Sequence, residues 1–320
     1  PFALTTDAAI EVPARELDLH INHGGRLYVL PCIAGHVGAD TAGVILSEEP
    51  QNQDQMTLLV DVGTNAEIVL GDKNRLLACS SPTGPAFEGA QISSGQRAAA
   101  GAVERVRIDA QTLEPRFRVI GSELWSDEVD FAAQTSKFGV TGICGSGIIE
   151  VVAEMFLAGI ITVDGVIDGA LVERSSRIIA DGRTFSYVLY QPDATAVIGV
   201  ERTTPITITQ NDVRQIQLAK AALYAGVKLL MDKISTDHID RIRLAGAFGS
   251  HINVKHAMVL GLIPDCALDQ VSSAGNAAGT GARIALLNRQ SRNTIESLVT
   301  NIEKIETAME PKFQQYFVDA

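Results

Sequence analysis

The sequence predicts an α/β protein in which a mixed sheet is flanked by helices. Short apolar runs rich in Val, Ile and Leu alternate with longer segments of helical periodicity. Glycine-rich turns stand at many of the junctions between them. With 320 residues, of which 46% are apolar and 20% charged, the chain is long enough to bury a large core. We therefore expect one large domain or two lobes.

Composition and charge exclude several classes of protein. The 38 acidic residues outnumber the 26 basic ones, and the net charge of −12 argues against a nucleic-acid partner. The four cysteines stand far apart without a C-x-x-C pair, so we expect reduced thiols and neither a zinc site nor an iron–sulfur cluster within this chain. The most apolar stretch, Val151 to Val163, contains Glu154 and is too short to cross a bilayer. These features predict a cytoplasmic protein without a membrane partner.

The first part of the chain predicts strands joined by tight turns. Residues 1–26 are mixed and loop-like, and the apolar run Leu27 to Leu30 predicts a strand followed by a turn and a helix. A three-stranded meander is predicted by three further apolar runs, which are Leu58 to Val62, Ala66 to Leu70 and Leu76 to Cys79. Residues 84–109 pass from a glycine-rich loop into an expected helix, and another strand is expected near Phe117 to Ile120.

The second part of the chain predicts helices that follow glycine-rich turns. The motif GICGSG opens a helix whose apolar positions share one face, namely Ile148, Ile149, Val152, Met155 and Phe156. The strongest helical stripe runs from Thr209 to Ile234, where Thr209 and Asp212 predict a capping box with Asp in place of Glu. The segment IDRIRLAGAFGSHIN predicts a strand, a turn and a helix start, and GNAAGTGARIALLN predicts a further helix. A peripheral helix is expected from Ser291 to Met309.

Four glycine-rich turns, DVGTN, GICGSG, AGAFGS and AGNAAGTG, are the candidate ligand-binding motifs. Such turns let backbone N–H groups approach an anion, and the N-terminus of a helix adds a favourable dipole. One such turn would be ordinary turn chemistry, but four in one chain favour an anionic ligand. The chain has no G-x-x-x-x-G-K-[ST] motif and no G-x-G-x-x-G motif after a strand, which excludes a P-loop NTPase and a dinucleotide-binding unit of that type.

The segment DVGTNAEIVL is the most informative of these motifs. Asp61 ends a buried strand, a Gly-Thr-Asn turn follows, and a second strand carries Glu67. In that arrangement Asp61 would hold Mg²⁺ through water, while the N–H groups of Thr64 and Asn65 would cradle a phosphate. The alternative is a plain β-hairpin with Asn at the turn.

These motifs carry a family resemblance. DVGTNAEIVLG is similar to a phosphate-loop hairpin of the acetate and sugar kinase, heat-shock ATPase and actin superfamily, and AGAFGSHIN to its adenosine loop. Seven stretches in order resemble the reductive activators of corrinoid-dependent proteins: PCIAGHVGADTAGVIL, DVGTNAEIVLG, GPAFEGAQISSGQ, GICGSGIIEVVAEM, ITQNDVRQIQLAKAALYAGV, AGAFGSHIN and AGNAAGTGARIALL. The resemblance covers residues 27–290 and implies an actin-like, ribonuclease H-like ATPase fold with one lobe and parts of the other.

The resemblance implies roles for individual residues. Asp61, Asn65 and Glu88 would be catalytic, and Asp61 would lie beside Mg²⁺, held through water. Cofactor-binding roles fall on residues of the glycine-rich turns: Gly63, Thr64, Asn65, Gly84, Gly145, Ser146, Gly246, Ala247, Phe248, Gly249, Gly275 and Asn276.

For several residues a structural alternative stays open. Glu88 is alternatively a solvated loop carboxylate, and Phe248 is alternatively part of the core. Cys144 is interpreted as a small buried residue and not as a redox centre. The histidines His36, His251 and His256 have no partners at metal-ligand spacing, so they are interpreted as ordinary histidines.

The activity implied by the resemblance is ATP-driven electron transfer. ATP and Mg²⁺ would bind the actin-like domain, and ATP hydrolysis would support reduction of a Co(II) corrinoid to Co(I). The electron would come from a two-iron–two-sulfur ferredoxin domain, for which this chain lacks the cysteines. The corrinoid protein and its methyltransferase would be the partners, and a homodimer is implied.

Only one phosphate hairpin is evident, whereas the superfamily clamps a nucleotide between two. We therefore expect this chain to be the C-terminal part of an activator, with the first lobe and the ferredoxin domain upstream of Pro1 and without tight ATP binding by itself. The expected boundaries are an N-terminal extension at 1–26, an ATPase domain at 27–290 and a C-terminal helical tail at 291–320. The alternatives are a small-molecule kinase of the same superfamily and a non-catalytic module that docks a corrinoid protein.

Overall fold

The computed structural model describes residues 3–192 and 204–320, with the side chains of Ala247 and Phe248 excepted. The chain divides into two compact units. Unit 1 comprises residues 3–82, 222–250 and 264–320, and unit 2 comprises residues 83–192, 204–221 and 251–263. Helix α4 (Gln210–Ile234) contributes residues to both. Each unit is described below by itself.

Unit 1 is built on a six-stranded mixed sheet. Its strands, in spatial order, are β13 (Val271–Gly275), β12 (Arg241–Ala245), β3 (Thr57–Val62), β4 (Ala66–Gly71), β5 (Leu76–Ser81) and β14 (Glu303–Lys304). Strands β3, β4 and β5 form the predicted antiparallel meander, while β12 pairs in parallel with both β3 and β13. The predicted α/β class with a mixed sheet flanked by helices is confirmed.

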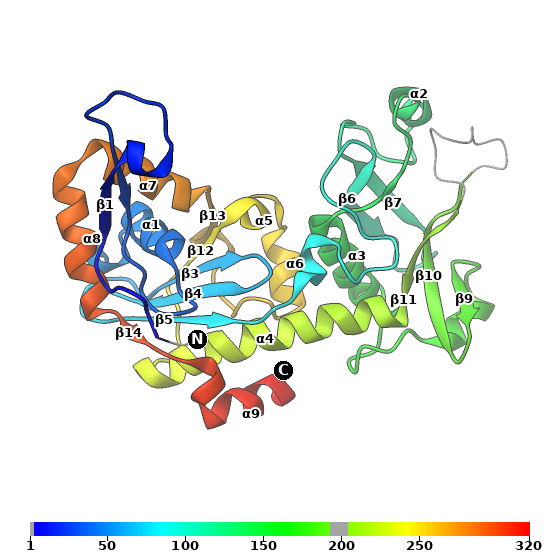
Figure 1. Cartoon of the computed structure of the whole chain (residues 1–320). Coiled ribbons are helices and arrows are strands. Elements are labelled where there is room, and N and C mark those ends of the chain that lie inside the picture. Colours follow the sequence, from blue (N-terminus) through cyan, green and yellow to red (C-terminus); the bar gives the residue numbers. More distant parts are fainter. Residues whose placement is uncertain (1–2, 193–203) are drawn as a thin grey trace. The chain divides into compact units, whose positions relative to one another are not determined.

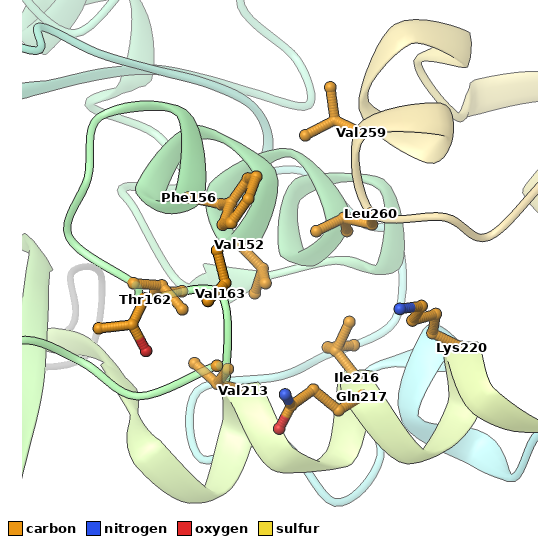
Figure 2. A pocket seen from close by; sticks show the side chains of 12 residues that line it. Val152, Phe156, Thr162, Val163, Val213, Ile216, Gln217, Lys220, Val259 and Leu260 are labelled. Atoms are coloured by element: carbon orange, nitrogen blue, oxygen red, sulfur yellow. The ribbon is translucent and has the colours of Figure 1, made fainter. Parts of the chain in front are cut away.

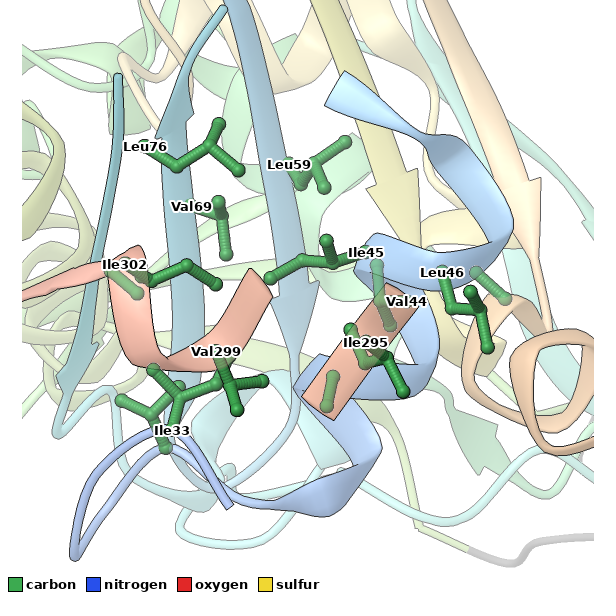
Figure 3. Close-up of a cluster of buried hydrophobic side chains, with 14 of the residues drawn as sticks. Ile33, Val44, Ile45, Leu46, Leu59, Val69, Leu76, Ile295, Val299 and Ile302 are labelled. Atoms are coloured by element: carbon green, nitrogen blue, oxygen red, sulfur yellow. The ribbon is translucent and has the colours of Figure 1, made fainter. Parts of the chain in front are cut away.

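Helices cover both faces of this sheet. On one face α1 (Ala39–Glu48), α7 (Ala277–Leu287) and α8 (Arg289–Asn301) pack over an apolar cluster that includes Leu59 of β3 and Val69 of β4 (Figure 3). On the other face the C-terminal half of α4 lies against the meander, because Ser81 Oγ donates to the carbonyl of Ala222 at 2.6 Å. The sheet core is therefore closed on both sides, as its nearly uninterrupted apolar strands require.

The C-terminal segment differs from the predicted peripheral helix. Helix α8 ends at Asn301, and β14, a 3₁₀ turn at Thr307–Met309 and helix α9 (Pro311–Asp319) follow. Ile295 and Val299 of α8 are buried in the core of unit 1, and β14 pairs with β5. Because these apolar positions lie four residues apart, they form one helical stripe, which packs onto the sheet. The expectation of a peripheral helix is wrong, while the domain boundaries stay predictions.

A two-stranded ribbon precedes α1. Strands β1 (Ile10–Pro13) and β2 (Arg26–Val29) pair antiparallel, so the predicted strand at 27–30 is confirmed and a second strand occupies part of the expected loop. A 3₁₀ turn, Ala14–Leu17, follows β1. Tyr28 of β2 donates to Glu296 at 2.7 Å and stacks with the Arg292 guanidinium, so α8 holds the ribbon.

Unit 2 contains two three-stranded sheets and α3 (Gly145–Leu157). One sheet has the order β7 (Pro115–Val119), β6 (Ala102–Ile108) and β8 (Gly142–Ile143), and the other has the order β11 (Ile206–Thr209), β10 (Thr184–Tyr190) and β9 (Ile178–Asp181). The remaining helices are α2 (Phe131–Thr135) and α6 (Val254–Val259). Helix α3 packs on β6 and on α6 (Figure 1).

The helix predicted within residues 84–109 is not formed. A 3₁₀ turn at Pro85–Glu88 is followed by irregular chain, and Ala102–Ile108 is strand β6. Gly89 has a φ of +85° and Gln91 a φ of +67°, conformations that interrupt a right-handed helix. Tertiary pairing of β6 with β7 and β8 therefore overrides the helical pattern.

The start of α4 matches its prediction closely. Asp212 Oδ2 accepts from the N–H of Thr209 at 2.8 Å, and Thr209 Oγ1 accepts from the N–H of Asp212 at 3.1 Å. These reciprocal bonds are the predicted capping box. Among the helices of the described chain, α4 included, none is long and apolar enough to cross a membrane.

Candidate functional site

Three of the four glycine-rich turns lie at one edge of the unit 1 sheet. Strands β3, β12 and β13 are parallel, and their carboxyl ends carry DVGTN, AGAFGS and AGNAAGTG. Ala245 of β12 pairs with Asp61 of β3 on one side and with Gly275 of β13 on the other. The three turns therefore begin at the same level of the sheet. The carboxyl edge of parallel strands is where α/β sheets bind ligands.

The turn after β12 lies directly against Asp61. Gly246 has a φ of +79°, and a Cβ at this position would stand 2.5 Å from Asp61 Oδ1. Glycine is therefore required here twice, for its backbone conformation and for the close approach of the carboxylate. The start of the predicted adenosine loop and the predicted phosphate loop thus meet at one point.

The hairpin turn after β3 carries two exposed residues at its tip. The N–H of Gly63 donates to the carbonyl of Asn65 at 2.9 Å, and Thr64 and Asn65 are exposed. Gly63 has no left-handed φ, and a Cβ there would only touch the Asn65 oxygen at 3.6 Å. The fold therefore does not require glycine at this position, and the ligand contact predicted for Gly63 stays a prediction.

The site is acidic, and burial acts on its carboxyls. Asp61 and Glu67 are cross-strand partners on β3 and β4. Burial raises the pKa of Asp61, and the charge of Asp40 in the first turn of α1 adds to the effect. Burial also raises the pKa of Glu67 to about 7, although a hydrogen bond from Ser80 Oγ at 3.1 Å opposes the shift. The carboxylates therefore favour a cation or a proton in this region.

Asp40 was not predicted as a site residue. It belongs to PCIAGHVGADTAG, a motif that suggested only a turn and a helix. Its distance from Asp61 along the chain hides the proximity, which arises because α1 packs on the sheet face that carries Asp61 and Glu67. An acidic residue in the first turn after a glycine-rich loop was the available signal.

Oxygen ligands of this kind fit Mg²⁺ better than a transition metal. Among the described residues, no group of three or more His, Cys, Asp or Glu side chains is arranged to hold a metal ion. Mg²⁺ commonly keeps several waters and takes substrate phosphate oxygens as ligands, so one or two carboxylates suffice. Asp61 fits this role, with Gly246 allowing its carboxylate to lie against the turn after β12.

A cavity of about 250 Å³ adjoins the hairpin turn. Asn65 and Ser80 line it together with His36 and the segment 305–308. Thr307 Oγ1 donates to the carbonyl of Ser80 at 2.9 Å, which holds that segment in place. His36, interpreted as an ordinary histidine, therefore lies beside the predicted phosphate turn.

In the third turn of unit 1, AGNAAGTG, the observed contacts cap α7 and pack it on α1. Asn276 Oδ1 accepts from the N–H of Gly279 at 2.8 Å and caps α7, and Gly275 has a φ of +60°. A Cβ at Gly281 would overlap the carbonyl of Gly43, so this glycine lets α7 pack closely on α1. The ligand contacts predicted for Gly275 and Asn276 stay predictions.

The AGAFGS turn is described only in part. A Cβ at Gly249 would stand 2.7 Å from the Leu244 carbonyl oxygen, so this glycine is required by packing. The predicted adenosine contacts of the side chains of Ala247 and Phe248 lie outside the described residues.

The other predicted residues belong to unit 2. Gly84, with a φ of +74°, precedes the 3₁₀ turn that ends at Glu88, whose side chain is exposed. Gly145 is the first residue of α3, and Ser146 is buried with its Oγ 3.4 Å from Cys144 Sγ. Cys144 is buried and free, as interpreted from the sequence. Cleft roles for these residues stay predictions.

Unit 2 also holds a cavity of about 150 Å³ between α3, α4 and α6 (Figure 2). Its lining is largely apolar, with Val152, Phe156 and Ile216 among the side chains that face it. Lys220 lies at its border, and burial lowers the pKa of this amine. None of the residues predicted to bind nucleotide lines this cavity.

Comparisons with known proteins point to one family. Residues 55–320 match the family model described as the C-terminal domain of RACo, the ASKHA domain, and residues 1–53 match the RACo middle region. The corrinoid activation enzyme RamQ of Eubacterium limosum is 34% identical over 321 residues, which cover 99% of this chain and 51% of that protein. The [Co(II) methylated amine-specific corrinoid protein] reductase of Methanosarcina barkeri is 26% identical over 285 residues, or 86% of this chain and 47% of that protein.

A solved structure gives the same result. A reductive activator for corrinoid, iron-sulfur protein superposes with a TM-score of 0.80 at 34% identity, over 97% of this chain and 46% of the other. The present chain thus spans about half the length of the curated relatives that it matches.

Proposed function

Since this chain belongs to the family of RACo C-terminal ASKHA domains, we propose that it is the ATP-binding part of a reductive activator of a corrinoid protein. The observation that carries the proposal is the meeting of Asp61 and Gly246 at the carboxyl edge of β3 and β12. Because Gly246 has no side chain, the turn after β12 lies directly against the half-buried carboxylate of Asp61, which brings two of the predicted nucleotide-binding motifs together. The names of the relatives, which concern corrinoid activation and corrinoid protein reduction, supply the substrate class.

The residues of unit 1 would hold the nucleotide as follows. Thr64 and Asn65 are exposed residues, and their N–H groups would donate to phosphate oxygens, while Gly63 would let the backbone approach them. Gly246 to Gly249 would flank the adenosine. Asp61 would hold a water of Mg²⁺, which when bound neutralises phosphate charge. Asn65 would help to orient the attacking water, so that hydrolysis rests on positioning, and the role of Glu88 of unit 2 stays a prediction.

The electron for cobalt must come from outside the described residues. Reduction of Co(II) to Co(I) takes up one electron, and the four cysteines of this chain are all free and lack cluster spacing. A two-iron–two-sulfur ferredoxin domain elsewhere in the activator would donate that electron. ATP would then shift the activator between two conformations. The effect on the bound corrinoid protein can be no larger than the difference in ATP affinity between those conformations. We also propose that the methyltransferase of the corrinoid protein is a partner and that the activator is a homodimer.

Binding of ATP and Mg²⁺ to the chain, measured by isothermal titration, tests the nucleotide site. Weak binding that disappears in Asp61→Asn is expected, because a second phosphate hairpin would come from outside this chain. Tight binding by this chain alone would contradict that second hairpin, and binding unaffected by Asp61→Asn would overturn the site.

The corrinoid assignment needs its own measurement. When the chain and ATP are added to a Co(II) corrinoid protein, we expect a complex whose stability depends on the nucleotide. Gel filtration with and without ATP detects this complex. Phosphate transfer to an added sugar or acid, detected by coupled ADP release, would instead favour a small-molecule kinase. Complex formation indifferent to ATP would favour a docking module without catalysis.

A further inference from the structure

A buried cluster of charged side chains joins α3, β6 and α6 in unit 2. Glu150 of α3 is fully buried, and Glu154, one turn further along the helix, is 9% exposed. His256 of α6 is 3% exposed. Charged groups are rarely buried to this degree unless they are paired, so each of these has a structural or functional reason.

Glu150 is paired on both of its oxygens. Arg105 Nη1 contacts Oε1 at 3.0 Å, and Arg107 Nη1 contacts Oε2 at 2.6 Å. The backbone N–H of Val106 also donates to Oε2 at 2.9 Å. Strand β6 therefore encloses this carboxylate with two guanidinium groups and one amide.

Glu154 is also bonded through both of its oxygens, one of them to His256. Its Oε1 lies 2.8 Å from His256 Nε2, and its Oε2 accepts from the N–H of Ile108 at 3.0 Å. Burial acts to raise the pKa of Glu154, but the bonds from His256 and Ile108 outweigh it and leave the pKa below its ordinary value. His256 Nδ1 makes no hydrogen bond within the described residues and lies 3.8 Å from Glu150 Oε1. The imidazole therefore stands between two carboxylates.

The cluster holds the chain that follows the predicted adenosine loop. Arg105 Nη1, besides its contact with Glu150, donates to the carbonyl of His251 at 2.9 Å. His251 is the last residue of α5 (Gly246–His251), whose first residue packs against Asp61. Five residues later His256 is bound by Glu154, and it lies in the first turn of α6, which Asn253 caps. Arg105, which pairs with Glu150, thus holds one end of residues 251–256, and Glu154 holds the other.

We propose that this cluster is a positioning clasp for the adenosine loop, with His256 as its positioning residue. This inference rests on the proposed function, because it takes residues 246–249 as nucleotide contacts. Ser146, Glu150 and Glu154 stand four residues apart on α3, so the GICGSG turn and the clasp lie along one stripe of that helix. One rigid element therefore connects the predicted turn at its N-terminus to the segment that leads out of the adenosine loop.

The chemistry of the cluster favours positioning over stability. A buried ion pair contributes little net stability compared with well-packed apolar side chains, but it tolerates only a narrow range of geometries. An apolar contact at His256 would allow α6 to slide on α3, whereas Glu154, bonded to both His256 and the N–H of Ile108, allows one register. His256 touches no predicted nucleotide contact, so it acts through α5 and is not a catalytic residue.

Hydrogen exchange of the chain, read by mass spectrometry with and without ATP and Mg²⁺, tests the clasp. His256→Leu should raise exchange in residues 246–263 by about tenfold or more and leave β3, β4 and β5 unchanged. His256→Gln should restore protection, since its amide can still donate to Glu154. ATP-induced protection of residues 246–249 should be lost in His256→Leu and kept in His256→Gln.

Two further variants keep the test decisive. His251→Ala removes an exposed histidine whose carbonyl, not its side chain, is used, and should match the unaltered chain. If His256→Leu does not fold, Glu154→Gln combined with His256→Leu removes the buried charge together with its partner and should show the same local exchange.

Unchanged exchange at residues 246–263, or an equal rise throughout both units, would overturn the clasp. A local rise in exchange that leaves ATP-induced protection intact would overturn its link to the adenosine loop. Absence of any ATP effect on the unaltered chain would count against the proposed function instead, since the exchange comparison of variants needs no nucleotide.

Discussion

Asp61 on β3 and Glu67 on β4 are direct cross-strand partners, and the pKa of each carboxyl is raised above its ordinary value by burial. Two carboxyls side by side in a partly dry environment repel each other when both are ionised. An unliganded site of this kind is therefore a source of instability that a bound cation relieves.

The first prediction concerns pH. The pKa of Glu67 rises from 4.5 to about 7 on folding, so the folded chain holds a proton that the unfolded chain has released. The free energy of unfolding should then be highest below pH 4.5 and fall as the pH rises towards 7. The full shift corresponds to about 3 kcal/mol, which solvent screening of this partly exposed carboxyl lowers to about 1–2 kcal/mol. Urea unfolding across this range measures the slope. Glu67→Gln should flatten it, and an equal slope in that variant would contradict the assignment.

The second prediction concerns Asp61→Asn. The neutral amide removes a buried charge near Asp40, so the free energy of unfolding should rise by up to about 1 kcal/mol while binding of ATP and Mg²⁺ disappears. A gain in stability with a loss of binding distinguishes a functional carboxylate from a structural one. Asp72→Asn is a matched control, because Asp72 lies in another hairpin turn of the same sheet and bonds only to its neighbours there. Loss of stability in Asp61→Asn would argue for a structural role.

The third prediction compares two glycines of the site. Gly63→Ala should leave stability within about 0.5 kcal/mol, since its Cβ has ordinary space, but weaken ATP binding about tenfold. Gly246→Ala should lose both stability and ATP binding. Its Cβ would meet Asp61 Oδ1, and the positive φ at this position disfavours any side chain. Thermal unfolding and titration of each variant separate the two cases. Normal ATP binding by Gly63→Ala would show that the phosphates lie elsewhere.

The fourth prediction assigns Gly281 to packing. A methyl group here would push α7 away from Gly43 of α1, and the free energy of unfolding should fall by about 2–3 kcal/mol. Gly275→Ala has open space around its Cβ and should cost only about 1 kcal/mol, from its positive φ. Chemical unfolding of both variants makes the comparison. Equal effects would remove the distinction between a packing glycine and a turn glycine.

Much of the fold follows from local patterns. The meander at β3, β4 and β5, the capping box of α4 and the glycine turn after β12 depend on apolar runs and turn residues that lie close together in the sequence. The predictions that are wrong concern β6 and the segment after α8. In both, strand pairing with distant partners decides the conformation, and a helical pattern of apolar residues is overridden.

The sequence by itself determined where the glycine turns and buried strands lie and which family the chain resembles, because these features depend on contiguous residues. Only the tertiary structure decided that Asp40 acts on Asp61 and Glu67, that Gly281 serves packing, and that His256 pairs with Glu154. These relationships join residues about 20 to 240 positions apart, and no local periodicity records them. The charge of a carboxyl is set by what folding places around it.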